Sequence, residues 1–145
     1  MGKVVQIGIV NTKGSKIQNI NKVEAFKGKG LLNDRKFSEN NQKERQITLI
    51  EIENINYFNS ISKTNISPLD FRRNIITENI RLNDLVGKEF IIGNVKLKGH
   101  DLCRPCKYLQ DKLKQNNLVK EFLRKGGLRC EILTSGKINV GDIIK

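Results

Sequence analysis

Short β-branched runs separated by turn residues dominate the hydrophobic pattern of this chain. Residues 4–10 (VVQIGIV) form the first such run, which is typical of a buried strand. We expect residues 22–26 to pair with it as a second strand, followed by a glycine-rich turn over 27–35. A further strand is expected at 74–77. The pattern therefore predicts an antiparallel sheet built from short strands.

The clearest local signal for a β-hairpin lies in residues 90–99. Gly93 and Asn94 supply the positive φ that a two-residue turn requires, and residues 95–98 alternate apolar and polar with period two. Later in the chain, residues 128–133 predict another strand, and residues 140–144 predict a turn into a short terminal strand.

Two segments predict helices. Thr48 and Glu51 have the spacing of a capping box, and apolar residues follow at helical spacing: Ile52, Ile55 and Phe58. The second predicted helix covers residues 109–125, where basic residues in the last turn suit the helix dipole and glycines at 126–127 can end it. Many short strands with about two helices indicate a β-rich α+β fold, a partly closed antiparallel or mixed β-barrel.

Length and composition favour one globular domain over residues 1–145. The apolar runs are much shorter than the roughly 20 residues that span a bilayer, and the first residues lack the features of a secretory signal. We therefore expect a cytoplasmic protein that is a monomer or a homodimer and has no membrane partner. The three cysteines, an odd number, disfavour a closed disulfide framework.

The chain is strongly basic: 27 Lys and Arg against 15 Asp and Glu give a formal net charge of +12. This balance favours an anionic partner, although a composition rich in Lys, Asn and Ile also produces a generic basic surface. A basic β-barrel that binds nucleic acid is one alternative. It is disfavoured because the few aromatic residues, six Phe and two Tyr, form no run that would stack bases.

Two thiols separated by Arg104 and Pro105 are the first place to look for chemistry. A thiolate attacks electrophiles and binds soft metals, and cationic neighbours favour it at Cys103 and Cys106. A zinc site is incomplete here, because His100 is the one histidine and no second cysteine pair exists, so no zinc is expected. Two other interpretations of this cysteine pair remain open: a thiol redox motif, and two buried thiols without a chemical role. Cys130, inside a predicted strand, is expected to fill the core.

Arginines form a second group of candidate functional residues. Arginine binds phosphate and carboxylate in a bidentate manner, and adjacent arginines in an extended segment point to opposite faces. The candidates are Arg35, Arg45, Arg72 and Arg73. Glu51 and Glu53 are available as structural partners for some of them. The glycines form no dinucleotide-binding or Walker-type loop.

Taken in order, these segments resemble the MOSC domain, the family named for the C-terminal region of molybdenum cofactor sulfurases. The matching segments are GLLNDRKF at 30–37, RQITLI at 45–50, FRRNIIT at 71–77, LNDLVGKEFIIG at 82–93, LCRPC at 102–106, and the closing residues 126–142. Two departures stand out. Asn33 replaces a glycine, which it can do because it tolerates a left-handed backbone. Lys36 replaces the usual histidine and adds a cation.

The resemblance implies a β-rich fold with one reactive cysteine that carries sulfur or ligates the molybdenum of a pterin cofactor. Cys106 matches that position best, with Cys103 as an accessory or resolving thiol. The cofactor-binding residues implied are Arg35, Arg45, Arg72, Arg73 and Asn74, and the implied cofactor is molybdopterin. The sequence then leaves open a molybdenum-dependent oxidoreductase and a sulfur-transfer protein with a sulfur donor or acceptor as partner.

Overall fold

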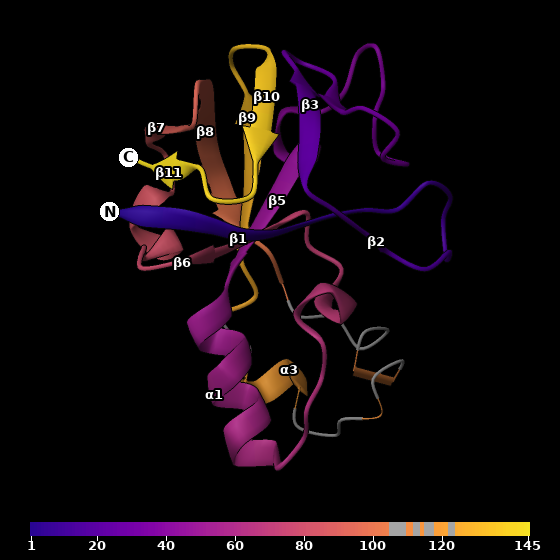
Figure 1. Cartoon of the computed structure of the whole chain (residues 1–145), viewed down its shortest axis with the longest axis vertical. Coiled ribbons are helices and arrows are strands. Elements are labelled where there is room, and N and C mark those ends of the chain that lie inside the picture. Colours follow the sequence, from indigo (N-terminus) through magenta and orange to yellow (C-terminus); the bar gives the residue numbers. More distant parts are fainter. Residues whose placement is uncertain (105–109, 112–113, 115–117, 122–123) are drawn as a thin grey trace.

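The strands close into a mixed β-barrel (Figure 1). The structure is a computed structural model that describes residues 1–104, 110–111, 114, 118–121 and 124–145. Seven strands form the closed ring in the order β1 (Gly2–Ile9), β11 (Ile143–Ile144), β7 (Glu89–Ile92), β8 (Val95–Leu102), β9 (Leu128–Ile132), β5 (Ile47–Glu51) and β6 (Ile75–Glu78). The ring is closed because β1 pairs with both β6 and β11. The predicted β-rich barrel is confirmed, and it is closed where partial closure was expected.

All pairings in the ring are antiparallel except β5 with β6, which is parallel. The short strand β2 (Gln18–Ile20) extends the ring beside β1. A separate sheet contains β10 (Gly136–Asn139), β3 (Lys22–Phe26) and β4 (Gly30–Leu31). The prediction that residues 22–26 pair with the first strand is wrong, because β3 pairs with β10 and β4.

Alternation along the strands places one apolar face inside the barrel. Side chains from every strand of the ring meet there, including the completely buried Val4, Leu49, Leu97 and Leu128. A second apolar cluster lies outside the ring between α1 (Ile52–Ser62) and the outer side of β5 and β6, where Ile55 and Phe58 are buried. The barrel is therefore packed on both sides near β5.

The predicted hairpin is confirmed. β7 and β8 are joined by Gly93 and Asn94, with Gly93 at φ +61°. The predicted strands near 4–10, 74–77, 128–133 and 143–144 are also present, as β1, β6, β9 and β11. These segments carry their signals locally, in β-branched runs and turn residues.

Thr48 does not begin a helix. It lies inside β5, and α1 starts at Ile52 with Glu51 preceding it in an extended conformation. The capping-box pattern fails because residues 47–50 are all buried between β6 and β9, so the apolar run is needed as a strand. The hydroxyl of Thr48 donates a hydrogen bond to Asn74 instead of capping a helix.

The prediction of a second helix over 109–125 lies largely outside the described residues. Within them, α3 (Leu118–Glu121) is a single helical turn. Three 3-10 helices are described: η1 (Lys43–Arg45), η2 (Pro68–Phe71) and η3 (Leu82–Leu85). None of the helices in the described part of the chain is both long and apolar enough to cross a membrane.

Candidate thiol and cation site

Cys103 follows directly after β8, where the backbone of a neighbouring segment holds it. Its N–H donates a hydrogen bond of 2.7 Å to the carbonyl oxygen of Gly127, just before β9. The side-chain Nε of Arg73 donates a bond of 2.9 Å to the carbonyl oxygen of Gly126. Two consecutive glycine carbonyls therefore bring the guanidinium of Arg73 to the same place as Cys103, although the two residues are far apart in the chain.

Three cations bear on the Cys103 thiol, but burial decides its protonation. The residue is 5% exposed, and burial raises the pKa of its thiol. The positive charges of Arg73, Lys36 and Arg129 act in the opposite direction without overcoming that effect. Cys103 is therefore a neutral thiol near pH 7, where the sequence suggested a cation-favoured thiolate.

Lys36 is the cation in this group that burial affects most. Burial lowers the pKa of its ammonium, and the charges of Arg35 and Arg73 lower it further. Asp34 opposes the shift, but its two carboxylate oxygens also accept the backbone N–H groups of Val10 and Lys36 itself. Burial and two arginines therefore disfavour the charged form of Lys36, and a bound anion would stabilise it as Asp34 does.

Arg129 is fixed by Asp101 across the β8–β9 pair. Its Nε donates to Asp101 Oδ1 at 2.9 Å, and its Nη2 donates to Oδ2, which makes the contact bidentate. The hydrogen bond lowers the pKa of Asp101 and raises that of Arg129. Beside this pair, His100 Nε2 lies 2.9 Å from Glu131 Oε1. Arg129 therefore enters the site already paired, whereas Lys36 and Arg73 have no carboxylate of the described residues within salt-bridge distance.

The other predicted arginines lie apart from one another. Arg35 is exposed and lines a cleft on the far side of the 33–37 turn, although its charge still acts on Lys36. Arg45 is exposed at the end of η1. Arg72 is half-buried and takes a left-handed backbone conformation, φ +64°, where η2 ends. Of the arginines predicted from the sequence, Arg73 is the one whose charge acts directly on Cys103.

Asn74 is buried and its side chain joins three strands. Its Oδ1 accepts hydrogen bonds from the N–H and the hydroxyl of Thr48, each 3.1 Å, in β5. Its Nδ2 donates to the carbonyl oxygen of Gly8 in β1 at 3.0 Å. These contacts use the amide inside the barrel wall and fix the backbone that presents Arg73.

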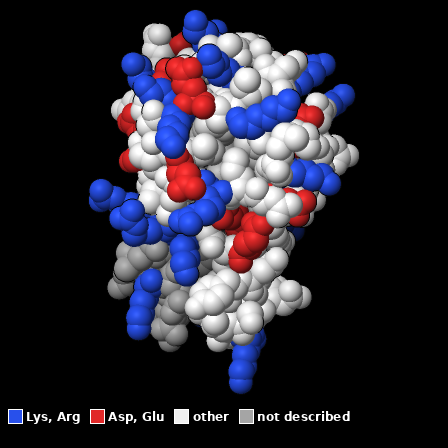
Figure 2. All heavy atoms as spheres, turned by 90° about the vertical axis from the view of Figure 1, so that its left-hand side faces the viewer, with Lys and Arg blue, Asp and Glu red and all other residues white. Residues whose placement is uncertain are grey.

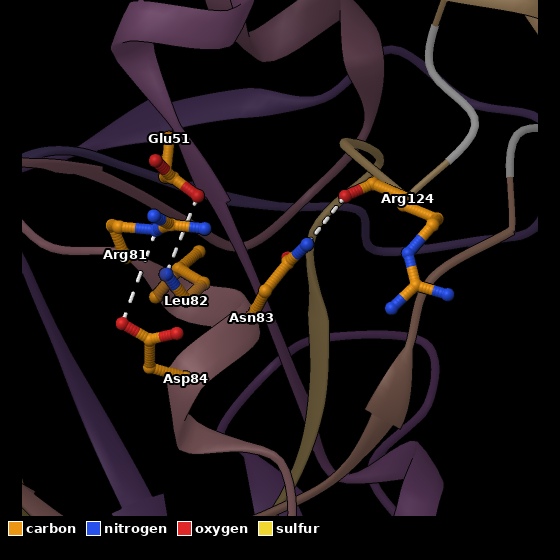
Figure 3. Close-up of polar contacts among 6 residues, drawn as sticks. All are labelled: Glu51, Arg81, Leu82, Asn83, Asp84 and Arg124. Carbon is orange, nitrogen blue, oxygen red and sulfur yellow. Dashed lines mark hydrogen bonds and ion pairs between the residues drawn. The ribbon is translucent and has the colours of Figure 1, made fainter.

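Polar contacts join η3 to the end of β5 and to Arg124, which lies shortly before the glycines at 126–127 (Figure 3). Asn83, in η3, donates from Nδ2 to the carbonyl oxygen of Arg124 at 2.8 Å. The same 3-10 helix is tied to the end of β5, because Leu82 N–H donates to Glu51 Oε2 at 3.3 Å. Burial raises the pKa of Glu51. Glu53 accepts the N–H of Asn79, so the two glutamates hold backbone rather than the predicted arginines.

Of the two remaining cysteines, the structure describes Cys130 but not Cys106. Cys130 is completely buried in β9, and burial raises its pKa well above that of a free thiol, as expected for a core residue. Cys106 lies outside the described residues. Within the part of the chain that is described, no three or more His, Cys, Asp or Glu side chains are grouped so as to hold a metal ion.

Lys36, Arg129 and Asp101 complete the site and were not singled out as functional from the sequence. In the sequence, Lys36 is noticeable only as a departure from a family pattern. The available signal was the alternation in β9, where Leu128, Cys130 and Ile132 are buried and Arg129 takes the other face. That signal places Arg129 on the outer face but does not show that it reaches Cys103.

The fold and site define a small closed β-barrel domain with a buried thiol at the end of a hairpin strand and, near it, two cations that have no salt-bridge partner among the described residues. Residues 33–145 match the sequence model of the MOSC domain, and the chain therefore belongs to the MOSC domain family. The family is linked to the C-terminal domain of molybdenum cofactor sulfurases, which gives this chain a context in molybdenum-cofactor biology. A comparison with curated protein sequences finds no match.

Solved structures share the fold at low sequence identity. The YuaD protein from Bacillus subtilis superposes with a TM-score of 0.83 at 22% identity, covering 99% of this chain and 94% of that one. YiiM from Geobacillus stearothermophilus gives 0.78 at 16% identity, covering 99% of this chain and 74% of that one. YiiM from Escherichia coli gives 0.73 at 15% identity, covering 100% and 69%. At these identities the likeness supports the fold alone.

Proposed function

We propose that this protein acts in molybdenum-cofactor chemistry through Cys106, whose thiolate either ligates the metal of a molybdopterin-type cofactor or carries sulfur as a persulfide. The observation that supports this proposal is the convergence of Lys36, Arg73 and Arg129 on Cys103, three residues before Cys106 in the chain. The family membership points to the same chemistry.

The donor set fits such a cofactor in two respects. Thiolate sulfur is a soft ligand, which suits a thiophilic metal or a sulfane sulfur atom. Lys36 and Arg73 are cations without a carboxylate partner among the described residues, which suits the phosphate of a pterin cofactor. When bound, the cofactor would supply a molybdenum centre for redox chemistry.

The chain's own residues would divide the work. Arg73, held at Gly126, and Lys36 would bind anionic groups. Arg129, oriented by Asp101, would add a fixed positive charge. Arg45 and Arg72 remain proposed cofactor ligands, and Arg35 would reach the cofactor only from the cleft side of the 33–37 turn. Asn74 would contribute by holding the backbone next to Arg73 rather than by direct contact.

In the sulfur-carrier form of the proposal, the Cys106 thiolate attacks the outer sulfur of a donor persulfide. The sulfur–sulfur bond of the donor breaks, a new one forms on Cys106, and the donor leaves as its thiolate. No external oxidant is required, because the sulfane sulfur arrives already oxidised. Cys103, neutral and buried, would stay protonated during this step.

The test is metal and pterin analysis of protein produced in a host that makes molybdenum cofactor. Wild type is compared with Cys106→Ser and with Cys130→Ala, a control that removes a buried thiol from β9. Near-stoichiometric molybdenum and pterin that disappear only in Cys106→Ser would establish cofactor binding and justify reductase assays.

If wild type carries no molybdenum, the protein is treated with a persulfide donor and Cys106 is examined by mass spectrometry for an added sulfur atom. A persulfide on Cys106 would support the carrier form. Failure of both measurements, or molybdenum retained by Cys106→Ser, would refute the proposed function.

A further inference from the structure

A cleft of about 1000 Å³ opens between the barrel and the smaller sheet, and residues of β1, β2, β3 and β10 line it. Its apolar lining comes from Ile9 at the end of β1, Ile20 in β2, Val23 in β3 and Phe37 after the turn. Phe37 is held in place by an edge-to-face contact with Phe26, with ring centroids 5.7 Å apart. The cleft therefore has a firm apolar floor and the volume of a small-molecule site.

Three cationic side chains also line the cleft, next to its apolar floor. Lys22 from β3, Lys137 from β10 and Arg35 from the turn all line the cleft, and all three are exposed. None of them has a carboxylate of the described residues within salt-bridge distance. Their charges are therefore available to a ligand.

Two acids also line the cleft and reduce its net charge. Glu24 lies opposite Lys137 in the β3–β10 register. Asp34 is buried, and its two oxygens accept backbone N–H groups on the barrel side. Since Asp34 is committed to the backbone, the charged groups that remain for a ligand are the three cations and Glu24.

The 33–37 turn separates this cleft from the thiol. Arg35 and Phe37 line the cleft, whereas Lys36 between them is coupled electrostatically to Arg73 and Cys103. Cys103, Arg73 and Arg129 are not among the residues that line it. The cleft is thus a second place where the fold gathers positive charge without a salt-bridge partner among the described residues.

We propose that this cleft binds a small organic anion, with an apolar body against Ile9, Val23 and Phe37 and a phosphate or carboxylate between Arg35 and Lys137. Burial of the body supplies affinity, and the cations select for charge and orient the ligand. Inorganic anions lack the apolar body, and neutral ring compounds lack the charge. The inference stands independently of Cys106.

Titration calorimetry at constant ionic strength tests the proposal with phenyl phosphate and benzoate as probes. Inorganic phosphate and phenol are the matched halves of phenyl phosphate, and acetate and benzyl alcohol serve as the anionic and neutral halves for benzoate. We expect at least one aryl anion to bind more tightly than either half by about tenfold or more. Phenyl phosphate and benzoate together distinguish a phosphate-selective from a carboxylate-selective cleft, and either preference supports the proposal.

Four variants locate the binding. Arg35→Gln should weaken it by about tenfold. Lys137→Gln should weaken it by about three- to fivefold, and Leu32→Ala, at the exposed apolar rim, by a similar factor. Lys3→Gln is the control, because it removes an equally exposed lysine from the opposite end of β1 and should change nothing.

Three results would overturn the proposal: no binding of either aryl anion, equal affinity for inorganic phosphate and phenyl phosphate, or equal losses in Lys3→Gln and Lys137→Gln. Cys106→Ser should bind the aryl anion as wild type does. Binding that survives in this variant separates the cleft from the proposed function, and binding that is lost with Cys106 would refute an independent site.

Discussion

Gly127 is the position where the backbone geometry of the site can be tested most directly. It adopts φ +111°, and an added Cβ would lie 2.0 Å from the carbonyl oxygen of Leu49 in β5. Its own carbonyl accepts the N–H of Cys103 at 2.7 Å. A side chain at Gly127 must therefore displace β5 or move the segment that holds Cys103.

The expected cost of Gly127→Ala follows from these two contacts. Overlap of the added Cβ with the Leu49 carbonyl, together with the left-handed backbone, costs about 1–3 kcal/mol. Loss of the hydrogen bond to Cys103 adds about 1 kcal/mol. Together they predict that the free energy of unfolding falls by about 2–4 kcal/mol, and that Tm falls by about 5–15 °C for a domain of this size.

Urea and thermal unfolding measure this loss, and Gly141→Ala is the matched control. Gly141 also has a positive φ, +97°, but an added Cβ there meets nothing within 4 Å. Its substitution should therefore cost only the backbone strain, about 1 kcal/mol. If the two variants lose equal stability, the close approach of Gly127 to Leu49 does not constrain the fold, and the argument fails.

Three further predictions concern single side chains. Asn74→Ala should lower the free energy of unfolding by about 2–4 kcal/mol because buried backbone and hydroxyl groups lose their partner; a urea-measured loss below about 1 kcal/mol would contradict this. Asp101 has a lowered pKa, so its stabilising effect is present above its unfolded pKa and is lost as pH falls through the folded value. Asp101→Asn, freeing half-exposed Arg129, should cost about 0.5–1 kcal/mol at pH 7 and flatten the acid limb, whereas an unchanged limb would refute the pairing. Alkylation of Cys103, followed by mass spectrometry, should be slow at pH 7 in wild type. It should be slower still in Lys36→Met, because a cation that favours the thiolate is removed. An equal or faster rate in the variant would show that Lys36 does not act on this thiol.

The elements that were predicted correctly carry their signal within a few residues. The β7–β8 hairpin depends on Gly93 and Asn94, β1 and β6 on β-branched runs, and β9 on its alternation of apolar and polar residues. Thr48 shows the limit of such signals. Its capping-box spacing is real, but the burial of residues 47–50 between two strands outweighs a cap. The partners of β3 and the closure of β1 onto β11 depend on register over long sequence separations, which no local pattern specifies.

The sequence indicated which residue types form the site, but not which of those residues the fold brings together. Arginine next to a thiol motif indicates anion and sulfur chemistry, and Arg73 does act on Cys103. The sequence does not show that Arg35 turns to a separate cleft or that the Asn74 amide is consumed by Thr48 and Gly8. These outcomes depend on which face each residue takes after the barrel closes.

The balance of charge around Cys103 links its reactivity to the occupancy of the anion site. Lys36 and Arg73 favour the thiolate only while their charges are uncompensated, so a bound anion should raise the pKa of the Cys103 thiol and also that of the Lys36 ammonium. By reciprocity, a protein whose Cys103 is ionised binds the anion less tightly. Inorganic phosphate should therefore slow Cys103 alkylation in wild type, and the effect should shrink in Lys36→Met. Cys103 is then least reactive when the anion site is filled, which makes it a poor candidate for the thiol that reacts with a bound anionic cofactor and leaves that role to Cys106 in the proposed mechanism.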